Sequence, residues 1–432
     1  MDAVLRLGYD AAGQLACALA AVTPNGDGKL VRALRARRGI RKRYAAWGAS
    51  RRERSRPLLW MHAPSVGEGL QARPVLQLAR GERADLQLAY TFFSPSAAAF
   101  ARTLEVDFAD YLPFDTDGEA RAALDALAPT ALVFSKLDVW PRLARAAAER
   151  RVALGLVSAT LAEGSSRRGA MATRLLRDAY ARLDAVGAID AGDAERLVGL
   201  GVHRDRITVT GDTRYDQVWA RVRGVNRDVG VVAALTSARP TLVAGSTWPT
   251  DERPLLAAWL DVRRAVPDAR LIIAPHEPTA AHLEPIERWA VEQRLRAARL
   301  AADDAAAADV VVVDRVGVLG DLYALGDVAY VGGGFHAAGL HSVLEPAAFG
   351  APVMFGPRFM NSRDAGLLMA AGGGVSVTGD AALAAALGSW LSDATARAQA
   401  GAAARALVER GLGAAERSWR LVERLLDAGV AR

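Results

Sequence analysis

Residues 58–76 read LLWMHAPSVGEGLQARPVL, and the pattern of this stretch changes half-way along it. It begins with an uninterrupted apolar run, which is typical of a strand covered on both faces of a sheet. It ends with the pattern of an apolar helix. Between them, the glycines of Ser-Val-Gly-Glu-Gly (65–69) permit a tight turn. The stretch therefore predicts a β-strand, a turn that carries the carboxylate of Glu68, and an α-helix.

The same alternation continues through the first half of the chain. Ala-rich stretches with helical spacing, such as 118–127 and 142–151, separate further apolar runs. The predicted buried strands are 58–63, 86–93, 131–136, 152–159 and 185–190. A β-α-β-α order of this kind predicts a doubly wound parallel sheet.

A second alternating series begins after a break at Arg239-Pro240. Its predicted strands are 241–246, 269–275, 309–314, 327–333, 351–356 and 374–377. Two Rossmann-like domains in tandem are therefore expected from the 432 residues, which are too many for one typical domain. The expected division is a basic segment 1–56, a first domain 57–215, a linker 216–238, a second domain 239–410 and a C-terminal helix 411–432.

The composition excludes some kinds of site and favours acidic partners. The single cysteine, Cys17, excludes an internal disulfide and has no partner for a Cys-based metal site. The net charge of +6 and the pI of about 9.7 favour nucleic acid, anionic lipid or phosphorylated substrates. The sequence contains no H-E-x-x-H or Walker A pattern, Asp115-Thr116-Asp117 has the context of a helix N-cap, and His62 that of a core or wall residue. We therefore expect no metal and no cofactor.

The positive charge is concentrated near the N-terminus. Residues 29–56 contain twelve Lys or Arg and one acid, Glu53. The uncharged run 11–26 before them is too short to span a bilayer, which takes about 20 apolar residues. Two interpretations stay open: an amphipathic helix followed by a solvated basic helix, or an interfacial anchor whose Arg face meets anionic lipid.

Ligands of open α/β sheets bind beyond the carboxyl ends of strands, so the residues after each predicted strand are the candidate site. Glu68 follows the first strand, near the start of a helix. It either complements the helix dipole, which is worth about 0.3–1 kcal/mol, or acts as a general base.

In the second domain, Ser246 and Thr247 end a predicted strand just before a helix that starts near Pro249. Hydroxyls and free N–H groups at that place form either a phosphate seat or an ordinary N-cap. His276 follows the next strand, as a ligand contact or as a structural hydrogen-bond partner.

Residues 327–357, DVAYVGGGFHAAGLHSVLEPAAFGAPVMFGP, carry the strongest site signal of the second domain. Ordering three successive glycines costs chain entropy, so we expect a ligand to lie against their backbone N–H groups. A glutamate early in the following helix could accept hydrogen bonds from vicinal ribose hydroxyls. The site residues expected in this block are Gly333, Gly334, His341, Ser342 and Glu345.

Taken together, these motifs resemble the 3-deoxy-D-manno-octulosonic acid (Kdo) transferases of lipopolysaccharide synthesis. The resemblance covers about residues 30–410. It rests on HAPSVGE (62–68), YLPFDTDG (111–118), LDVWP (137–141), GDTRYD (211–216), GSTWPTDE (245–252), APHEP (274–278), GDVAYVGGGF (326–335) and HSVLEPAAFGAPVMFGP (341–357).

The resemblance implies a GT-B glycosyltransferase, with two Rossmann-like domains facing a central cleft, the acceptor on the first and the nucleotide on the second. It implies CMP-Kdo as the donor, a lipid A precursor (lipid IVA) as the acceptor, inversion at the transferred carbon, and no metal. It also implies that Glu68 is the catalytic base. Together with the basic run 29–56, a lipid acceptor leads us to expect a peripheral or weakly anchored protein on the anionic cytoplasmic face of the inner membrane.

The sequence departs from the usual family pattern at three places. Lys136 and Asp138 stand where two glutamates usually precede the Trp-Pro pair. Residues 158–165, SATLAEGS, replace the usual N-A-R-x-S-x-R-S, and Ser342 replaces an asparagine. Many members also open with a clearer membrane helix. These differences concern acceptor recognition and anchoring, so the exact acceptor and the number of Kdo units added stay open.

Two other functions compete with this one. The first is a GT-B transferase, or an epimerase of similar fold, that uses a different nucleotide sugar. The second is nucleic-acid binding through the basic N-terminus, with the salt dependence of counterion release. No nucleic-acid-binding module is recognised, and the basic stretch lies outside both predicted domains. We therefore expect no nucleic-acid partner.

Overall fold

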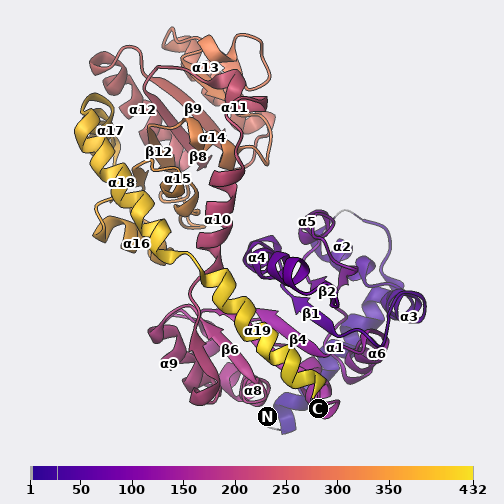
Figure 1. The fold of residues 1–432 in the computed structure, drawn as a ribbon. Helices are drawn as coiled ribbons and strands as arrows, with labels where there is room; N and C mark the ends of the chain where they lie inside the picture. The colour runs from indigo at the N-terminus through magenta and orange to yellow at the C-terminus, as the bar shows by residue number, and fades with distance from the viewer. Residues whose placement is uncertain (1–2, 27, 432) are drawn as a thin grey trace. The chain divides into compact units, whose positions relative to one another are not determined.

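The chain folds into two α/β units, which Figure 1 shows in a computed structural model. The structure describes residues 3–26 and 28–431. Unit 1 contains Met1–Gln217 together with Gly413–Arg432, and unit 2 contains Val218–Leu412. Each unit is built on its own seven-stranded parallel sheet. The parallel α/β class that the apolar runs predicted is therefore confirmed for both halves of the chain.

The sheet of unit 1 has the strand order β3-β2-β1-β4-β5-β6-β7. Its strands are β1 (Leu58–His62), β2 (Gln87–Phe92), β3 (Phe108–Tyr111), β4 (Ala131–Ser135), β5 (Ala153–Ala159), β6 (Ala185–Ala188) and β7 (Ile207–Val209). The first strand, β1, pairs in parallel with β2 on one side and with β4 on the other. The chain therefore winds outward from β1 in both directions, and the strand order reverses between β1 and β4.

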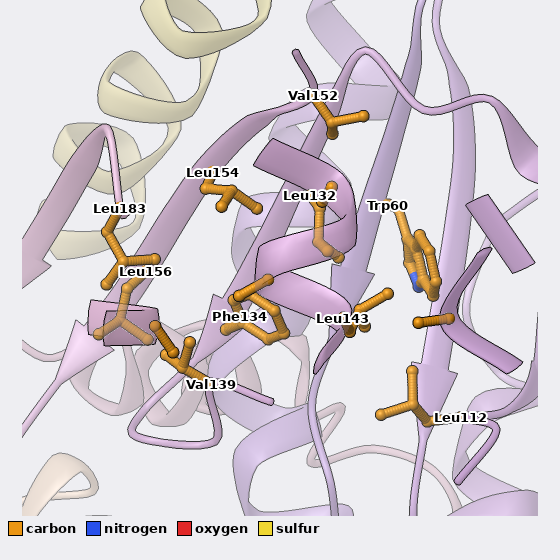
Figure 2. Packing of buried hydrophobic residues seen from close by; sticks show 14 of the residues in the cluster. Trp60, Leu112, Leu132, Phe134, Val139, Leu143, Val152, Leu154, Leu156 and Leu183 are labelled. Carbon is orange, nitrogen blue, oxygen red and sulfur yellow. The ribbon is translucent and has the colours of Figure 1, made fainter. Parts of the chain in front are cut away.

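Helices connect these strands and cover both faces of the sheet. They are α4 (Val66–Glu82), α5 (Ala97–Ala101), α6 (Asp117–Leu127), α7 (Pro141–Glu149), α8 (Ala170–Tyr180) and α9 (Ala191–Leu200). On one face, a core that includes Trp60, Phe134 and Leu156 is fully buried (Figure 2). On the other face, α19 (Ala414–Val430) returns from the end of the chain and buries Trp419 and Leu426 against the sheet. The C-terminal helix thus completes the core of unit 1.

The sheet of unit 2 has the strand order β10-β11-β9-β8-β12-β13-β14. Its strands are β8 (Thr241–Thr247), β9 (Arg270–Pro275), β10 (Ala297–Arg299), β11 (Val310–Val312), β12 (Val328–Val331), β13 (Val353–Phe355) and β14 (Gly374–Ser376). Here β8 is the first strand, and it pairs in parallel with β9 and β12. The strand order therefore reverses between β8 and β12, as it does between β1 and β4 in unit 1.

The helices of unit 2 include part of the segment that was expected to be a linker. They are α10 (Thr213–Gly224), α11 (Gly230–Leu235), α12 (Pro249–Ala265), α13 (Ala280–Glu292), α14 (Leu319–Leu322), α15 (Leu344–Ala348), α16 (Arg363–Ala370), α17 (Asp380–Ser392) and α18 (Ala394–Gly411). Leu235 of α11 is buried in a core of unit 2, and the boundary between the units falls inside α10. Residues 218–238 therefore belong to unit 2.

The basic N-terminal segment is part of unit 1. It forms α1 (Ala3–Val22), α2 (Lys29–Ala36) and α3 (Ile40–Ser50), and Tyr44 is buried in the core. The guanidinium of Arg37 is buried and donates to the carbonyl oxygens of Leu112 (2.8 Å) and Phe93 (3.0 Å). Five donors in a planar fork suit a cluster of unpaired carbonyls. The expectation of a solvated basic helix is therefore wrong for Arg37, whose guanidinium links the end of α2 to the residues that follow β2 and β3.

Candidate active site

Glu68 lies at the carboxyl edge of the first sheet, where the strand order reverses. It is the third residue of α4, whose N-cap is Ser65, and α4 follows β1. Lys136 directly follows β4, the neighbour of β1 at the reversal. Open α/β sheets bind their ligands at such a reversal. The fold therefore places the predicted base where a substrate is expected.

Two side chains hold the Glu68 carboxylate. Lys136 Nζ lies 3.1 Å from Glu68 Oε1, and the Ser65 hydroxyl donates to Oε2. The Glu68 side chain keeps 17% of its surface exposed. Burial raises the pKa of Glu68, but the bonds from Ser65 and Lys136 outweigh burial and leave the pKa below its usual value. The carboxylate is therefore ionised at neutral pH and able to accept a proton.

The two departures from the family pattern, Lys136 and Asp138, both have partners of opposite charge. Lys136 has a left-handed backbone φ of 66°, which a non-glycine residue keeps only where its surroundings enforce it. Asp138 forms an ion pair with Arg167 of the 3-10 turn Ser166–Arg168. Burial raises the pKa of Asp138, Arg167 lowers it, and Glu68 adds to the rise. The charges thus alternate in sign along Glu68, Lys136, Asp138 and Arg167.

His62 is a core residue, as its sequence context predicted. Its side chain is fully buried, Nε2 accepts a hydrogen bond from Trp140 Nε1 (3.1 Å), and Nδ1 lies 3.0 Å from Thr91 Oγ1. An indole N–H can only donate, so the imidazole proton is on Nδ1. Burial lowers the pKa of His62 to about 3. The neutral ring therefore orients Trp140, the N-cap of α7, and carries no charge near Glu68.

The predicted nucleotide residues lie at the corresponding reversal of the second sheet. Ser246, the second-last residue of β8, has a left-handed φ of 55°, a conformation that costs about 1–3 kcal/mol for a non-glycine residue. Thr247 differs from the expectation. It is buried, and its hydroxyl donates to Glu252 Oε1 at 2.8 Å. The Thr247 hydroxyl is thus used inside the fold, and the half-exposed Ser246 carries the hydroxyl that faces outward at this strand end.

Packing accounts for the glycine run 332–334, which the sequence had attributed to a ligand. A Cβ on Gly332 would collide with the end of β8, and one on Gly334 would collide with Gly356 at the end of β13. Gly333 has a φ of 93°, which favours glycine. The close approach of the ends of β8, β12 and β13 therefore already requires these glycines.

Asp251 organises this loop and was missed by the sequence reasoning. It is the third residue of α12 and is fully buried. Its carboxylate accepts hydrogen bonds from the backbone N–H groups of Gly333 (2.8 Å), Phe335 (3.0 Å) and Trp248 (3.0 Å), and from the Tyr330 hydroxyl (3.3 Å). The N–H of Gly333 is therefore not free for an anionic ligand. An acid three residues after a helix N-cap was the signal in the sequence.

Three of the six histidines gather around Trp248 at this edge. His336 and His276 stack on Trp248 with ring centroids 4.3 and 4.6 Å away. His341 stacks on His276 at 4.5 Å, and its Nε2 lies 3.3 Å from Trp248 Nε1. Burial lowers the pKa of His341, and His276 and His336 add to the effect. The structure thus brings the predicted His276 and His341 together and adds Trp248 and His336 to them.

Ser342 and Glu345 belong to the same loop and the helix that follows it. Ser342 is exposed, and Glu345 lies in the first turn of α15. Glu345 Oε1 is 3.7 Å from the guanidinium of Arg221, which also bonds Asp321 at 2.8 Å. Burial raises the pKa of Glu345, and Arg221 opposes the rise. The Glu345 side chain is 28% exposed.

The D-x-D stretch 115–117 has the capping role that its context predicted. Asp115 accepts hydrogen bonds from the backbone N–H groups of Arg142 (2.9 Å) and Leu143 (2.8 Å) at the start of α7. Thr116 is the N-cap of α6. In the part of the chain that the structure describes, no three His, Cys, Asp or Glu residues are grouped as a metal site. The metal-independent reaction stays a prediction.

The sequence and the fold both resemble known proteins. The family model for "3-Deoxy-D-manno-octulosonic-acid transferase (kdotransferase)" matches residues 33–217. The 3-deoxy-D-manno-octulosonic acid transferase of Bordetella pertussis is 31% identical over 327 residues, which are 71% of this chain and 73% of that protein. The transferase of Chlamydia muridarum is 28% identical, over 70% of each chain.

Among solved structures, a UDP-GlcNAc 2-epimerase from Neisseria meningitidis bound to UDP-GlcNAc matches 86% of this chain and all of its own, with a TM-score of 0.63 and 12% identity. A UDP-GlcNAc 2-epimerase from Methanocaldococcus jannaschii matches 78% of this chain and 93% of its own, with a TM-score of 0.56 and 12% identity. At this identity the likeness concerns the fold, and it confirms the GT-B class. With a relative of 31% identity matched over most of its length, the chain belongs to the 3-deoxy-D-manno-octulosonic acid transferase family and is a glycosyltransferase.

Proposed function

We propose that this protein transfers Kdo from CMP-Kdo to a lipid A precursor, lipid IVA, with inversion at the transferred carbon and without a metal ion. The observation that carries this assignment is the ionised, partly exposed Glu68 carboxylate at the reversal of the first sheet, in a member of the Kdo transferase family. The acceptor then binds unit 1 and the donor binds unit 2.

Glu68 is the catalytic base in this reaction. As a glucosamine hydroxyl attacks the anomeric carbon of Kdo, its proton moves to a carboxylate oxygen of Glu68, and the bond from that carbon to the CMP phosphate oxygen breaks. Attack opposite to the leaving group inverts the configuration. Lys136 and Ser65 fix the orientation of the carboxylate. A positioned base of this kind contributes about 10²–10⁴ to the rate.

The departing CMP gains negative charge on its phosphate, and unit 2 offers neutral donors for it. Because His341 Nε2 faces the indole N–H of Trp248, the neutral ring carries its proton on Nδ1 and can donate from there. Hydroxyl and imidazole donors aimed at developing charge stabilise it without a cation. We assign Ser246, His276, His341 and Ser342 to this phosphate, and Glu345 to the ribose hydroxyls.

The protein works as a peripheral protein at the cytoplasmic face of the inner membrane. Within the described part of the chain, none of the helices has both the length and the apolar character that crossing a bilayer requires. One face of α1 exposes Leu7, Leu15 and Val22, and α2 adds exposed Arg32 and Arg35. Apolar and basic side chains in this combination suit the interface of an anionic membrane.

Binding to vesicles tests this location. We expect affinity for phosphatidylglycerol vesicles to fall as salt rises, because exposed charges are screened over about 8–10 Å at physiological ionic strength. Equal binding to neutral vesicles at all salt concentrations would contradict an electrostatic peripheral contact.

The decisive experiment is incubation with CMP-Kdo, generated in situ, and lipid IVA, followed by mass spectrometry. We expect the mass of the acceptor to rise by one or more Kdo units, which also counts the sugars. UDP-GlcNAc without acceptor is the second arm, and its epimerisation would replace the transferase assignment. Calorimetry with CMP and with UDP then checks the nucleotide independently of turnover, and we expect CMP to bind more tightly.

A further inference from the structure

An open apolar groove lies between α1 and α8 in unit 1. Its cavity has a volume of about 620 Å³, and its lining includes Leu5, Gly8, Tyr9, Ala170, Met171 and Leu175. In Figure 1 the N-terminal end of α1 comes close to α8. Met171 is 70% exposed, and no residue from Ala170 to Asp178 of α8 is buried. The apolar side chains of α8 that line the groove are therefore open to solvent.

The wall formed by α1 is fixed in place. The Tyr9 hydroxyl donates to Asp115 Oδ2 at 2.6 Å, and Asp10 forms an ion pair with the buried Arg142. Asp115 is itself held by the start of α7. Asp115, just before α6, and Arg142 of α7 thus anchor this helix, so that the groove is a preformed feature of the fold.

The surroundings of the groove decide what fits it. On the neighbouring side of α8, a second hollow of about 630 Å³ also includes Ala170 and carries Arg168 and Arg174. An apolar channel beside exposed guanidinium groups matches an amphiphile that has acyl chains and phosphates. Ser166 also lines the groove, and the next residue, Arg167, pairs with Asp138 in the charge series that leads to Glu68. The ion pair of Arg167 with Asp138 therefore links the edge of the groove to the candidate active site of unit 1.

We infer that this groove holds one acyl chain of the phosphorylated lipid acceptor while its sugar is presented at Glu68. This inference rests on the proposed function, since it names the part of the acceptor that the groove binds. A cavity of this size lies within the range of about 300–1,000 Å³ that small-molecule sites occupy. The chain would cover Leu5, Met171 and Leu175, which now face open space.

Gly8 gives a direct test, because it lines the groove and its backbone leaves room for a Cβ. A Cβ on Gly8 meets no atom within 4 Å. We expect Gly8→Phe to raise the KM for lipid IVA about tenfold or more, since each methylene that stays in water costs about fourfold in affinity. The KM for the deacylated glucosamine disaccharide bisphosphate and the kcat for both acceptors should stay as in the wild type.

Two variants serve as matched controls. Gly8→Ala adds a methyl group only, and Gly81→Phe places the same ring on another exposed helical glycine of unit 1 with no atom within 4 Å. Both should keep the wild-type KM for lipid IVA. Thermal melting of all three variants checks that they fold. A folded Gly8→Phe protein whose KM for lipid IVA is unchanged overturns the inference.

A binding assay separates this result from failure of the proposed function. A dansyl-labelled undecanoic acid should bind the wild type, be displaced by lipid IVA, and bind Gly8→Phe at least tenfold more weakly. If the wild type transfers Kdo to neither acceptor, the proposed function fails. Displacement of this probe by lipid IVA would still show whether the groove binds an acyl chain of that lipid. If Gly8→Phe weakens binding to phosphatidylglycerol vesicles but leaves the KM for both acceptors unchanged, the groove serves the membrane and the inference is wrong.

Discussion

Each unit has an acid at the third position of the helix that follows the first strand of its sheet, and the two acids have different surroundings. Glu68 is the third residue of the helix after the central strand of unit 1, and Asp251 is the third residue of the corresponding helix of unit 2. Glu68 keeps 17% of its side chain exposed, whereas Asp251 is fully buried and binds three backbone N–H groups of its own unit. The residue at this position is therefore a candidate catalytic group in unit 1, whereas in unit 2 it holds a loop in place.

The largest effect that tests this difference is loss of the base. We expect Glu68→Gln to lower kcat about 10²–10⁴-fold, because the amide cannot take the acceptor proton. CMP affinity by calorimetry should stay close to that of the wild type, and the loss of stability should be smaller than that of Asp251→Asn. Retention of more than half of the activity would make Glu68 a helix cap like any other.

Glu119 offers a matched control for this substitution. It is the third residue of α6 and pairs with Arg41 at 2.7 Å, so it has the same helix position and a similar partner. Glu119→Gln should lose only the helix-dipole contribution of about 0.3–1 kcal/mol and keep full activity. A loss of activity equal to that of Glu68→Gln would show that the helix position, and not the base, matters.

The second effect concerns Asp251. Asp251→Asn keeps the shape but removes the charge that three N–H groups share, and hydrogen bonds to a charged group are worth about 1.5–3 kcal/mol each. We expect the free energy of unfolding to fall by about 3 kcal/mol, measured by urea denaturation, with weaker CMP binding as a consequence. Glu68→Gln should show the opposite profile. An Asp251→Asn protein of wild-type stability would remove the distinction between the two acids.

The third effect separates a ligand contact from a scaffold contact at Glu345. A carboxylate that binds two ribose hydroxyls is worth about 1.5–3 kcal/mol, so Glu345→Ala should weaken CMP binding about 10- to 100-fold and raise the donor KM. The apo melting temperature should change little, because the nearest Arg221 nitrogen is 3.7 Å away. A protein that melts several degrees lower but is still stabilised fully by CMP would assign Glu345 to the scaffold with Arg221.

The fold was predictable where strands are buried on both faces. The interior strands β1, β2, β4, β5, β8, β9 and β12 lie within the predicted apolar runs or within one residue of them. Three edge strands were missed: β3, β7 and β10. Each is short and has residues that are only partly buried, so its sequence shows no continuous apolar run. Pairing to a neighbour, and not local pattern, creates these strands.

The candidate site was predictable in position and less so in detail. Strand ends marked Glu68, Ser246, His276 and His341 correctly as residues at the two reversals. The sequence could not show that Glu252 takes the Thr247 hydroxyl or that Asp251 takes the Gly333 N–H. Such pairings depend on distances across the loop, which no spacing in the chain encodes. Likewise, the twelve basic residues of 29–56 did not reveal that Arg37 is buried.

The smallest effect tests how Glu68 differs from a buried structural acid. Lys136 and Ser65 lower the pKa of Glu68 against the effect of burial. A carboxylate base is active only when ionised, so kcat/KM falls as the pH drops through this pKa. Lys136→Met removes one of the two opposing groups, and the pKa of Glu68 should rise. We therefore expect the acid limb of the kcat/KM profile to move to higher pH.

The neighbouring charges set the control for this shift. Lys136→Arg keeps the positive charge beside Glu68 and should leave the acid limb near its wild-type position, while His62 is neutral and cannot move it. The pKa of Asp138 also depends on Lys136, but Arg167 holds Asp138 in an ion pair, so Asp138→Asn should not reproduce the shift.

Stability depends on the ionisation of Glu68 in the same direction as activity. Ionised Glu68 contributes stability above its unfolded pKa of about 4.3, and this contribution disappears as the pH falls through the folded pKa. Lys136→Met should thus lose stability at neutral pH and none at a pH below both pKa values. An acid limb that stays in place in Lys136→Met would mean that another group controls it. Glu68 would then be a structural acid, as Asp251 is, and not the base.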